Sequence, residues 1–239
     1  SPYSSNIKGR VYLQPGPGYY GIKDLFNDGL IKQAVNITDD TSYKLQRDGN
    51  AFTDLICAEY QYQKDHNDLK YNIIRLPNQY YYQDLEDYIC KLDMNIDFIN
   101  HHTCSSMTVG DFNDYIKESP SCFTIIWIYG SLRAGKQLDT NNIGFVHDTA
   151  ISGPDVVAQS LLGRILGYNK CHHKVRCYTD VKSAKLMLDW IKSAYDTMKI
   201  PAGSKGIVGG FTQKISGSCW EKHVPLIVKM DCDMRSYYR

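Results

Sequence analysis

FTIIWIYGSLRAGKQLDTNNIGFVHDTAISGPDVVAQSLLGRILGY (residues 123–168) is the stretch that decides the fold of this 239-residue chain. It opens with FTIIWIY (123–129), a continuous run of apolar and β-branched residues that is typical of a strand buried on both faces of a sheet. A glycine-containing turn follows, then a second strand (143–148) and a helix (154–166), with Pro154 placed where its missing N–H costs nothing. This order predicts part of an α/β domain.

The same alternation of strands and helices continues on both sides of this stretch. The sequence predicts strands at 71–77, 96–102, 123–129, 143–148 and 174–180, and helices at 83–92, 109–119, 154–166 and 181–195. Strands that alternate with helices in this way favour a parallel sheet covered by helices on both faces. We expect this α/β domain to occupy residues 65–200.

The segments that flank the domain have a different composition. Residues 1–64 are expected to form a linker and helical lead-in, with a helix at 22–31, a polar turn at 41–49 and a helix at 53–65. Residues 201–239 begin with a glycine-rich run and then include a strand-like apolar run. We therefore expect a β-containing appendage there.

The composition favours a globular protein without a membrane span. Hydrophobic residues make up 43% of the chain, enough for a core, and 22% of residues are charged. No run of about 18 apolar residues is present, as a membrane helix would need. The first residues, SPYSSNIKGR, lack the apolar segment of a secretory signal, so an intracellular location is expected. They also lack an initiator methionine, so we expect a fragment of a longer protein.

The turn GSLRAGKQ (130–137) has the glycine and lysine spacing of a phosphate-binding P-loop. A P-loop continues with Ser or Thr, which binds Mg²⁺, and leads directly into a helix. Here Gln137 and then another predicted strand follow instead. An independent NTPase that uses Lys136 is therefore an alternative that the local sequence disfavours, and an ordinary glycine turn fits better.

The ordered spacing of these elements resembles the second RecA-like lobe of superfamily 2 (DEAD/DEAH-type) helicases and translocases. Gly135 lies where that family has the glycine of motif V, and Gln159 with the pair Gly163-Arg164 lies where it has the motif VI helix. The resemblance covers about residues 68–195. It implies a RecA-like fold for the predicted parallel sheet.

In that family ATP binds between two RecA-like lobes, so the resemblance also implies a nucleotide site. The first lobe supplies the P-loop and the acidic Mg²⁺ motif, which this chain lacks, and the second supplies an arginine that reaches the γ-phosphate. By resemblance Arg164 is this catalytic arginine and Gln159 acts beside it, while Gly135, Lys136 and Gly163 approach the nucleotide. A planar, permanently charged guanidinium suits the stabilisation of a transferring phosphoryl group. ATP and Mg²⁺ would be shared with a first lobe outside this chain, so we expect no hydrolysis by the chain alone.

The resemblance further implies contacts with nucleic acid from loops that follow the strands. The expected contact residues are Arg75, Asn78, His101, His102, Thr103 and Arg133. The expected partners are DNA or RNA in single-stranded form and a RecA-like N-terminal lobe. A packing role for the two histidines is the competing interpretation. For the whole chain, the competing interpretation is a non-catalytic module that binds nucleic acid or serves as a scaffold.

Overall fold

The computed structural model describes residues 15–35, 37, 41–76, 81–102, 109–129, 132, 137–148, 153–168, 175–194, 201–202 and 204. The strands are β1 (Ile31–Gln33), β2 (Tyr71–Arg75), β3 (Ile96–His102), β4 (Phe123–Tyr129), β5 (Ile143–Asp148) and β6 (Arg176–Thr179). The helices are α1 (Ile22–Asn27), α2 (Thr41–Asp65), α3 (Tyr81–Cys90), α4 (Val109–Tyr115), α5 (Pro154–Gln159), α6 (Leu161–Arg164) and α7 (Val181–Lys192). Most of the predicted appendage lies outside the described residues.

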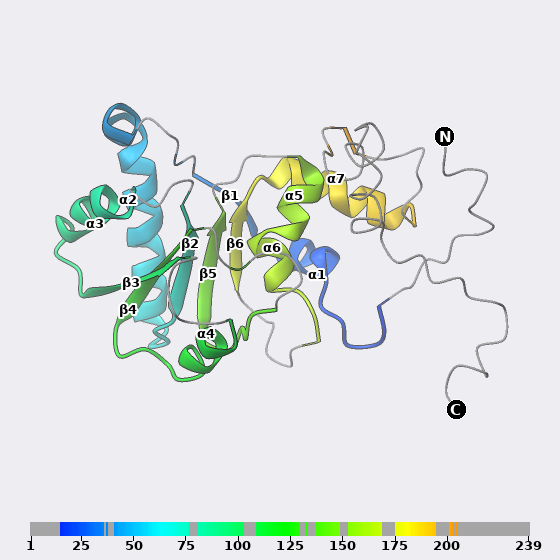
Figure 1. The fold of residues 1–239 in the computed structure, drawn as a ribbon, viewed down its shortest axis with the longest axis horizontal. Coiled ribbons are helices and arrows are strands. Elements are labelled where there is room, and N and C mark those ends of the chain that lie inside the picture. The colour runs from blue at the N-terminus through cyan, green and yellow to red at the C-terminus, as the bar shows by residue number, and fades with distance from the viewer. Residues whose placement is uncertain are drawn as a thin grey trace, which may run out of the picture. The chain divides into compact units, whose positions relative to one another are not determined.

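The strands form one sheet in the order β1-β6-β5-β2-β4-β3, and every neighbouring pair is parallel (Figure 1). This confirms the predicted α/β class, a parallel sheet with helices, and is consistent with a RecA-like fold. The five predicted strands are all present. β1 is an additional strand that the sequence did not predict, and it pairs with β6 at the end of the sheet.

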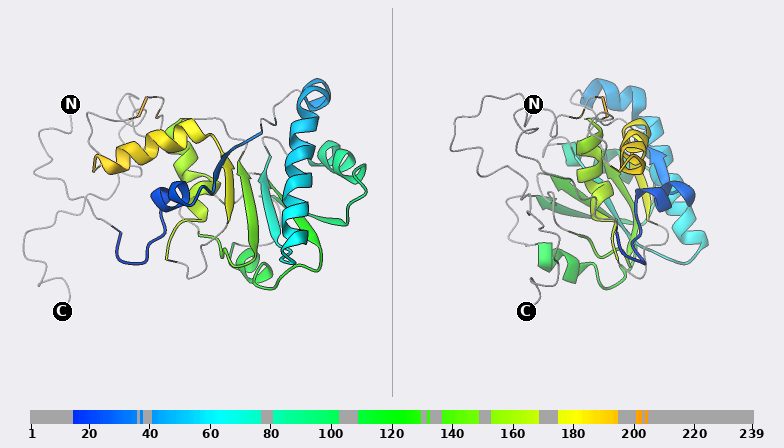
Figure 2. Two further views of the ribbon diagram at one scale, coloured as in Figure 1. Left: turned by 180° about the vertical axis from the view of Figure 1, so that it is seen from behind. Right: turned by 90° about the vertical axis from the view of Figure 1, so that its right-hand side faces the viewer.

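Helices cover both faces of the sheet (Figure 2), and the side chains of β4 show how the two cores divide. Ile125 and Trp127 point to one face, where they pack with apolar residues of α2 and α3. Ile126 and Ile128 point to the other face, where they pack with residues of α1, α4, α5, α6 and α7. Successive residues of a strand face opposite sides. A continuous apolar run can therefore fill both cores.

The lead-in expected at residues 1–64 contributes to this domain through β1 and α2. The predicted turn at 41–49 is wrong, because α2 already begins at Thr41. Its described residues 52, 56, 59 and 63 are buried on the sheet with helical spacing. Two of these four positions are polar, which hides the helical pattern in the sequence. Among the described residues, no helix has the length and apolar composition needed to cross a membrane.

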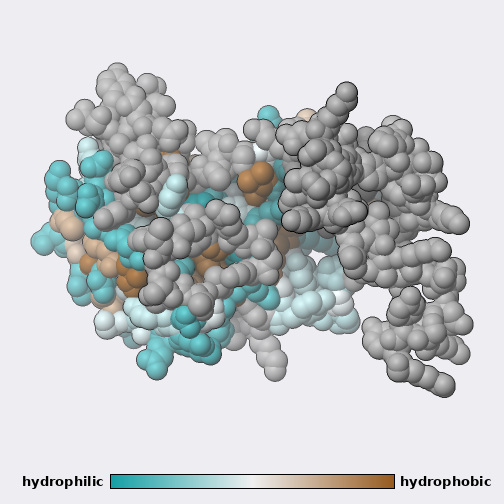
Figure 3. Space-filling model, in the orientation of Figure 1, coloured by the Kyte–Doolittle hydropathy of each residue, from teal (hydrophilic) through white to brown (hydrophobic). Residues whose placement is uncertain are grey.

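β3 forms the other end of the described sheet. Hydrophobic residues reach the surface in this region, as the space-filling view shows (Figure 3). The ring of Phe98 stacks at 6.2 Å on the ring of Trp127 in β4, and Ile99 packs against the core on the opposite face. These contacts hold the edge strand to its one neighbour.

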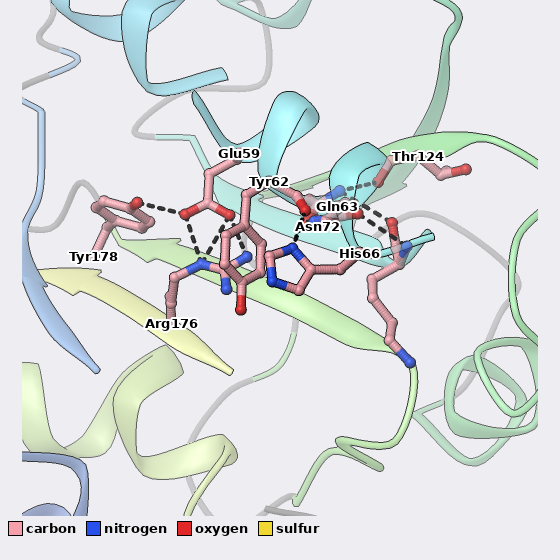
Figure 4. A network of polar contacts seen from close by, with 9 residues as sticks. Glu59, Tyr62, Gln63, His66, Asn72, Thr124, Arg176 and Tyr178 are labelled. Carbon is pink, nitrogen blue, oxygen red and sulfur yellow. Dashed lines mark hydrogen bonds and ion pairs between the residues drawn. The ribbon is translucent and has the colours of Figure 1, made fainter. Parts of the chain in front are cut away.

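A buried ion pair fastens α2 to β6 (Figure 4). Arg176 donates through Nε to both carboxylate oxygens of Glu59, at 2.7 and 2.8 Å, and Tyr178 donates its hydroxyl to Oε1 at 2.6 Å. The guanidinium carbon of Arg176 also lies 4.1 Å from the centre of the Tyr62 ring. Because these groups are mostly out of water, each depends on its partner for stability.

A second polar contact fastens α2 to the centre of the sheet (Figure 4). Gln63 donates to the side-chain oxygen of Asn72 at 2.8 Å, and Asn72 donates to the carbonyl oxygen of Thr124 in β4 at 3.2 Å. Gly144 in β5 faces this pair, and a Cβ there would lie 2.7 Å from the Asn72 oxygen. The glycine therefore leaves the space that the two amides fill.

Candidate functional site

The connections that follow β2 and β5 leave the carboxyl edge of the sheet on opposite faces. β2 is followed by α3 on one face, and the neighbouring β5 is followed by α5 on the opposite face. Open α/β sheets bind ligands where adjacent strands lead away in opposite directions. The last residues of these two strands, Arg75 and Asp148, lie opposite each other in register.

Asp148 joins three elements at this point. Its Oδ1 lies 3.5 Å from Nε of Arg75, and its Oδ2 accepts a hydrogen bond from the backbone N–H of Leu161 at 3.1 Å. Only 3% of Asp148 is exposed to solvent. The carboxylate therefore connects the end of β2 and the end of β5 to the first residue of α6.

Arg164 is at the end of α6, within the electrostatic range of Arg75. Only 5% of Arg164 is exposed to solvent. Its Nη2 donates a hydrogen bond to the carbonyl oxygen of Gln159 at 2.5 Å. Burial and the neighbouring charge of Arg75 lower the pKa of Arg164. The group remains charged at neutral pH because an arginine pKa starts so high. The charge of Arg75 thus acts on the guanidinium of Arg164.

A break between α5 and α6 accompanies the contact of Leu161, the first residue of α6, with Asp148. The sequence predicted one helix over 154–166, but Ser160, with φ of −83° and ψ of −145°, is not helical and divides it. Gly163 then packs so closely on the carbonyl oxygen of Ala158 that a Cβ at this position would collide with it. The glycine before Arg164 is therefore needed for the close packing of α6 against the end of α5.

The structure brings four of the predicted site residues together: Arg75, Gln159, Gly163 and Arg164. Gln159 contributes its backbone carbonyl to Arg164, while the residue itself is exposed. Arg75, which the resemblance placed with nucleic acid, lies 3.5 Å from Asp148, and its charge acts on Arg164. The sequence did not single out Asp148. A polar pair, His147-Asp148, at the end of an otherwise apolar strand is the signal that could have found it.

The remaining predicted residues lie on β3 or outside the described part of the chain. His101 is 3% exposed, and its ring packs 4.9 Å from the ring of Phe112 in α4, as expected for a residue that packs in the core. His102 is the last residue of β3. Asn78, Thr103, Arg133, Gly135 and Lys136 lie outside the described residues.

His147, next to Asp148, faces the other side of the sheet. Its Nε2 accepts a hydrogen bond from the backbone N–H of Val35 at 3.2 Å, and its ring lies against Phe52 and Tyr178. Burial lowers the pKa of His147 to about 4, although the charge of Asp148 acts in the opposite direction. The imidazole is therefore neutral in the folded protein at physiological pH, and it ties the segment after β1 to β5.

The low pKa of His147 predicts a loss of stability in mild acid. The unfolded state takes up a proton near pH 6.5 and the folded state only near pH 4, so stability is complete above about 6.5 and falls as the pH drops toward 4. We expect His147 to account for about 3 kcal/mol of this fall. Urea unfolding of the chain and of His147→Gln, between pH 4 and 7, measures it. An equally steep fall in the variant would contradict the assignment.

A cleft of about 650 Å³ lies at the opposite, amino edge of the sheet. It is lined by residues that include Lys70, Asn141 and Arg176. Arg176 is paired with Glu59, and Lys70 is paired with Asp68 at 2.9 Å and with the carbonyl of Asn141 at 3.0 Å. Because the charges of this cleft already satisfy one another, we assign no ligand to it. The described residues contain no cluster of three or more His, Cys, Asp or Glu side chains placed to hold a metal ion.

Comparison with known proteins gives a relative but no family. No protein-family model matches the chain. The chain is 33% identical over 217 residues to "Uncharacterized protein L594" of Acanthamoeba polyphaga mimivirus, and the alignment covers 87% of this chain and 52% of that protein. The chain thus spans about half the length of the curated relative that it matches.

Proposed function

We propose that the chain is the C-terminal motor lobe of an ATP-dependent nucleic-acid helicase or translocase. The observation that carries the proposal is a buried arginine, Arg164, on which the charge of Arg75 acts. It ends the short helix α6, whose first residue is bonded to Asp148 at the carboxyl edge, where β2 and β5 lead away in opposite directions. The family resemblance of residues 68–195 supports the same conclusion. A relative about twice as long leaves room for the first lobe that such a motor requires.

Arg164 would act on the γ-phosphate of ATP bound between the two lobes. In this chain its Nη2 is held by a neutral acceptor, the carbonyl oxygen of Gln159. A hydrogen bond from a guanidinium to a charged phosphoryl oxygen is about twice as strong as one between neutral groups. Arg164 would therefore exchange the Gln159 carbonyl for a phosphoryl oxygen when the lobes close on the nucleotide.

The chemical contribution of Arg164 is electrostatic. Charge spreads over the equatorial oxygens of the phosphoryl group during transfer, and a positioned guanidinium stabilises it without forming a covalent bond. The P-loop and Mg²⁺, which would neutralise much of the phosphate charge, would belong to the first lobe. Within this chain Gly163 sets the position of the helix end that carries the arginine.

The nucleic acid would cross the loops that follow the strands. Asn78, His102, Thr103 and Arg133 follow or end β2, β3 and β4, and side chains of these types contact phosphate oxygens without reading the base sequence. DNA or RNA in single-stranded form is the proposed partner. Because His101 is buried and Arg75 is next to Asp148, the proposal includes no direct contact between these two residues and nucleic acid.

The test compares ATP hydrolysis by the full-length protein with hydrolysis by residues 1–239 alone, each with and without single-stranded DNA or RNA. We expect hydrolysis that nucleic acid stimulates in the full-length protein, and none in the isolated chain. Hydrolysis by the isolated chain that Lys136→Ala abolishes would show an independent NTPase and overturn the proposal. A full-length protein that binds nucleic acid but hydrolyses no ATP would instead be the non-catalytic module.

A further inference from the structure

We propose that Asp148 is the positioning residue of this site, and that it holds Arg164 in the orientation needed for phosphoryl transfer. This role rests on the proposed function, because Asp148 acts through Arg164. Two contacts of one buried carboxylate carry it, and the sequence alone did not indicate Asp148.

The two oxygens of Asp148 serve different elements. Oδ1 faces Nε of Arg75 at the end of β2, and Oδ2 accepts the N–H of Leu161, the first residue of α6. α6 has only four residues and ends at Arg164. Fixing its first residue therefore fixes the position of Arg164 within a single turn.

Asp148 also acts on Arg164 electrostatically, through the charge of Arg75. Burial lowers the pKa of Arg164, and the charge of Arg75 lowers it further, so the two guanidinium groups repel each other. Asp148 carries a negative charge against Arg75, and it is almost completely buried, so solvent screens this interaction little. Without the carboxylate, the repulsion would act on Arg164 without compensation and move it away from its position.

A second carboxylate, Asp180, separates this role from a purely structural one. Asp180 follows β6 in a similar position, where it accepts the backbone N–H of Lys182 at 3.2 Å and caps α7. It too fixes the beginning of a helix after a parallel strand. Since its contacts to α7 are with Lys182 and Ser183, Asp180 serves as a matched control that lacks the link to Arg75 and Arg164.

The experiment uses the full-length protein with Asp148→Asn, Asp180→Asn, Arg164→Ala and the double variant Asp148→Asn/Arg164→Ala. Asparagine at 148 keeps an oxygen that can accept the N–H of Leu161 but removes the charge. We expect kcat for ATP to fall by about 10²-fold in Asp148→Asn, because misplacing a catalytic group by about 1 Å costs this much. KM for ATP should change little, since the effect is on the transition state. Asp180→Asn should keep kcat within about twofold of the wild type, as surface changes away from the site do.

The decisive readout is the double variant. If Asp148 acts through Arg164, Asp148→Asn has no further effect once Arg164 is alanine. An equal fall of kcat in both backgrounds, or no fall in the wild-type background, would overturn the inference and leave the proposed function intact. Unchanged turnover in Arg164→Ala alone would instead overturn the proposed function. If Asp148→Asn does not fold, Asp148→Glu replaces it in the experiment, because glutamate keeps the charge but moves it by one methylene. Its kcat is measured with and without Arg164→Ala, and the expected and contradicting results are the same as for Asp148→Asn.

Discussion

Replacing Arg164 by alanine in the full-length protein should lower the turnover of ATP by about 10³-fold or more. Arginines that reach the γ-phosphate from a second lobe or a partner contribute about 10³–10⁵ to the rate, which is about 4–7 kcal/mol of transition-state stabilisation. The affinity for single-stranded nucleic acid should remain within a few fold, because the contacts proposed for nucleic acid come from other loops. Steady-state ATP hydrolysis and filter binding measure the two quantities.

Arg164→Lys separates charge from shape in this prediction. Lysine keeps the positive charge but loses the planar fork that binds two phosphoryl oxygens at once, so we expect only a small part of the rate to return. Arg176→Lys is the matched control, because Arg176 is also largely buried but belongs to the ion pair with Glu59 at the other edge of the sheet. It should lower stability and leave turnover unchanged in the folded protein. Unchanged turnover in Arg164→Ala would rule out the assignment.

The central part of the fold could be predicted because it obeys one simple requirement. A strand buried on both faces needs apolar residues at nearly every position, and β4, FTIIWIY, was therefore located with its observed bounds. β1 could not be predicted in this way, because IKQ is short and has one apolar residue. It is a strand because it pairs with Cys177, Tyr178 and Thr179 of β6, far along the chain. The local sequence therefore does not indicate such a pairing.

The candidate site was predictable only in part for a related reason. Glycine and arginine at 163 and 164 stand out because the family resemblance marks their spacing. Asp148 does not, since a carboxylate at the end of a strand is usually exposed, and its partner Arg75 lies 73 residues earlier in the sequence. Only the parallel register of β2 and β5 places the two side by side. Parallel strands need long connections, so two residues that meet across neighbouring parallel strands are always far apart in the sequence.

Replacing Glu59 by alanine should lower the free energy of unfolding by about 3–5 kcal/mol, because removing one partner from a buried ion pair leaves the other charge buried without compensation. Here the uncompensated group is Arg176, and the hydroxyl of Tyr178 also loses its acceptor. A domain is stable by only about 5–15 kcal/mol in total, so the loss is a large part of its stability. Urea unfolding of the chain, followed by circular dichroism, measures the loss.

Two comparisons decide whether this loss comes from the buried charge. The pair Lys117–Asp114 has both side chains more than half exposed, so Asp114→Ala should lower the stability far less than Glu59→Ala. The double variant Glu59→Leu/Arg176→Met removes both charges, and it should be more stable than Glu59→Ala because no buried charge remains unpaired. If the double variant is less stable than Glu59→Ala, the ion pair stabilises the protein through packing and hydrogen bonds that leucine and methionine cannot replace. A small loss for Glu59→Ala itself would mean that α2 does not depend on β6 for its position, and that the Gln63–Asn72 contact alone holds it to the sheet.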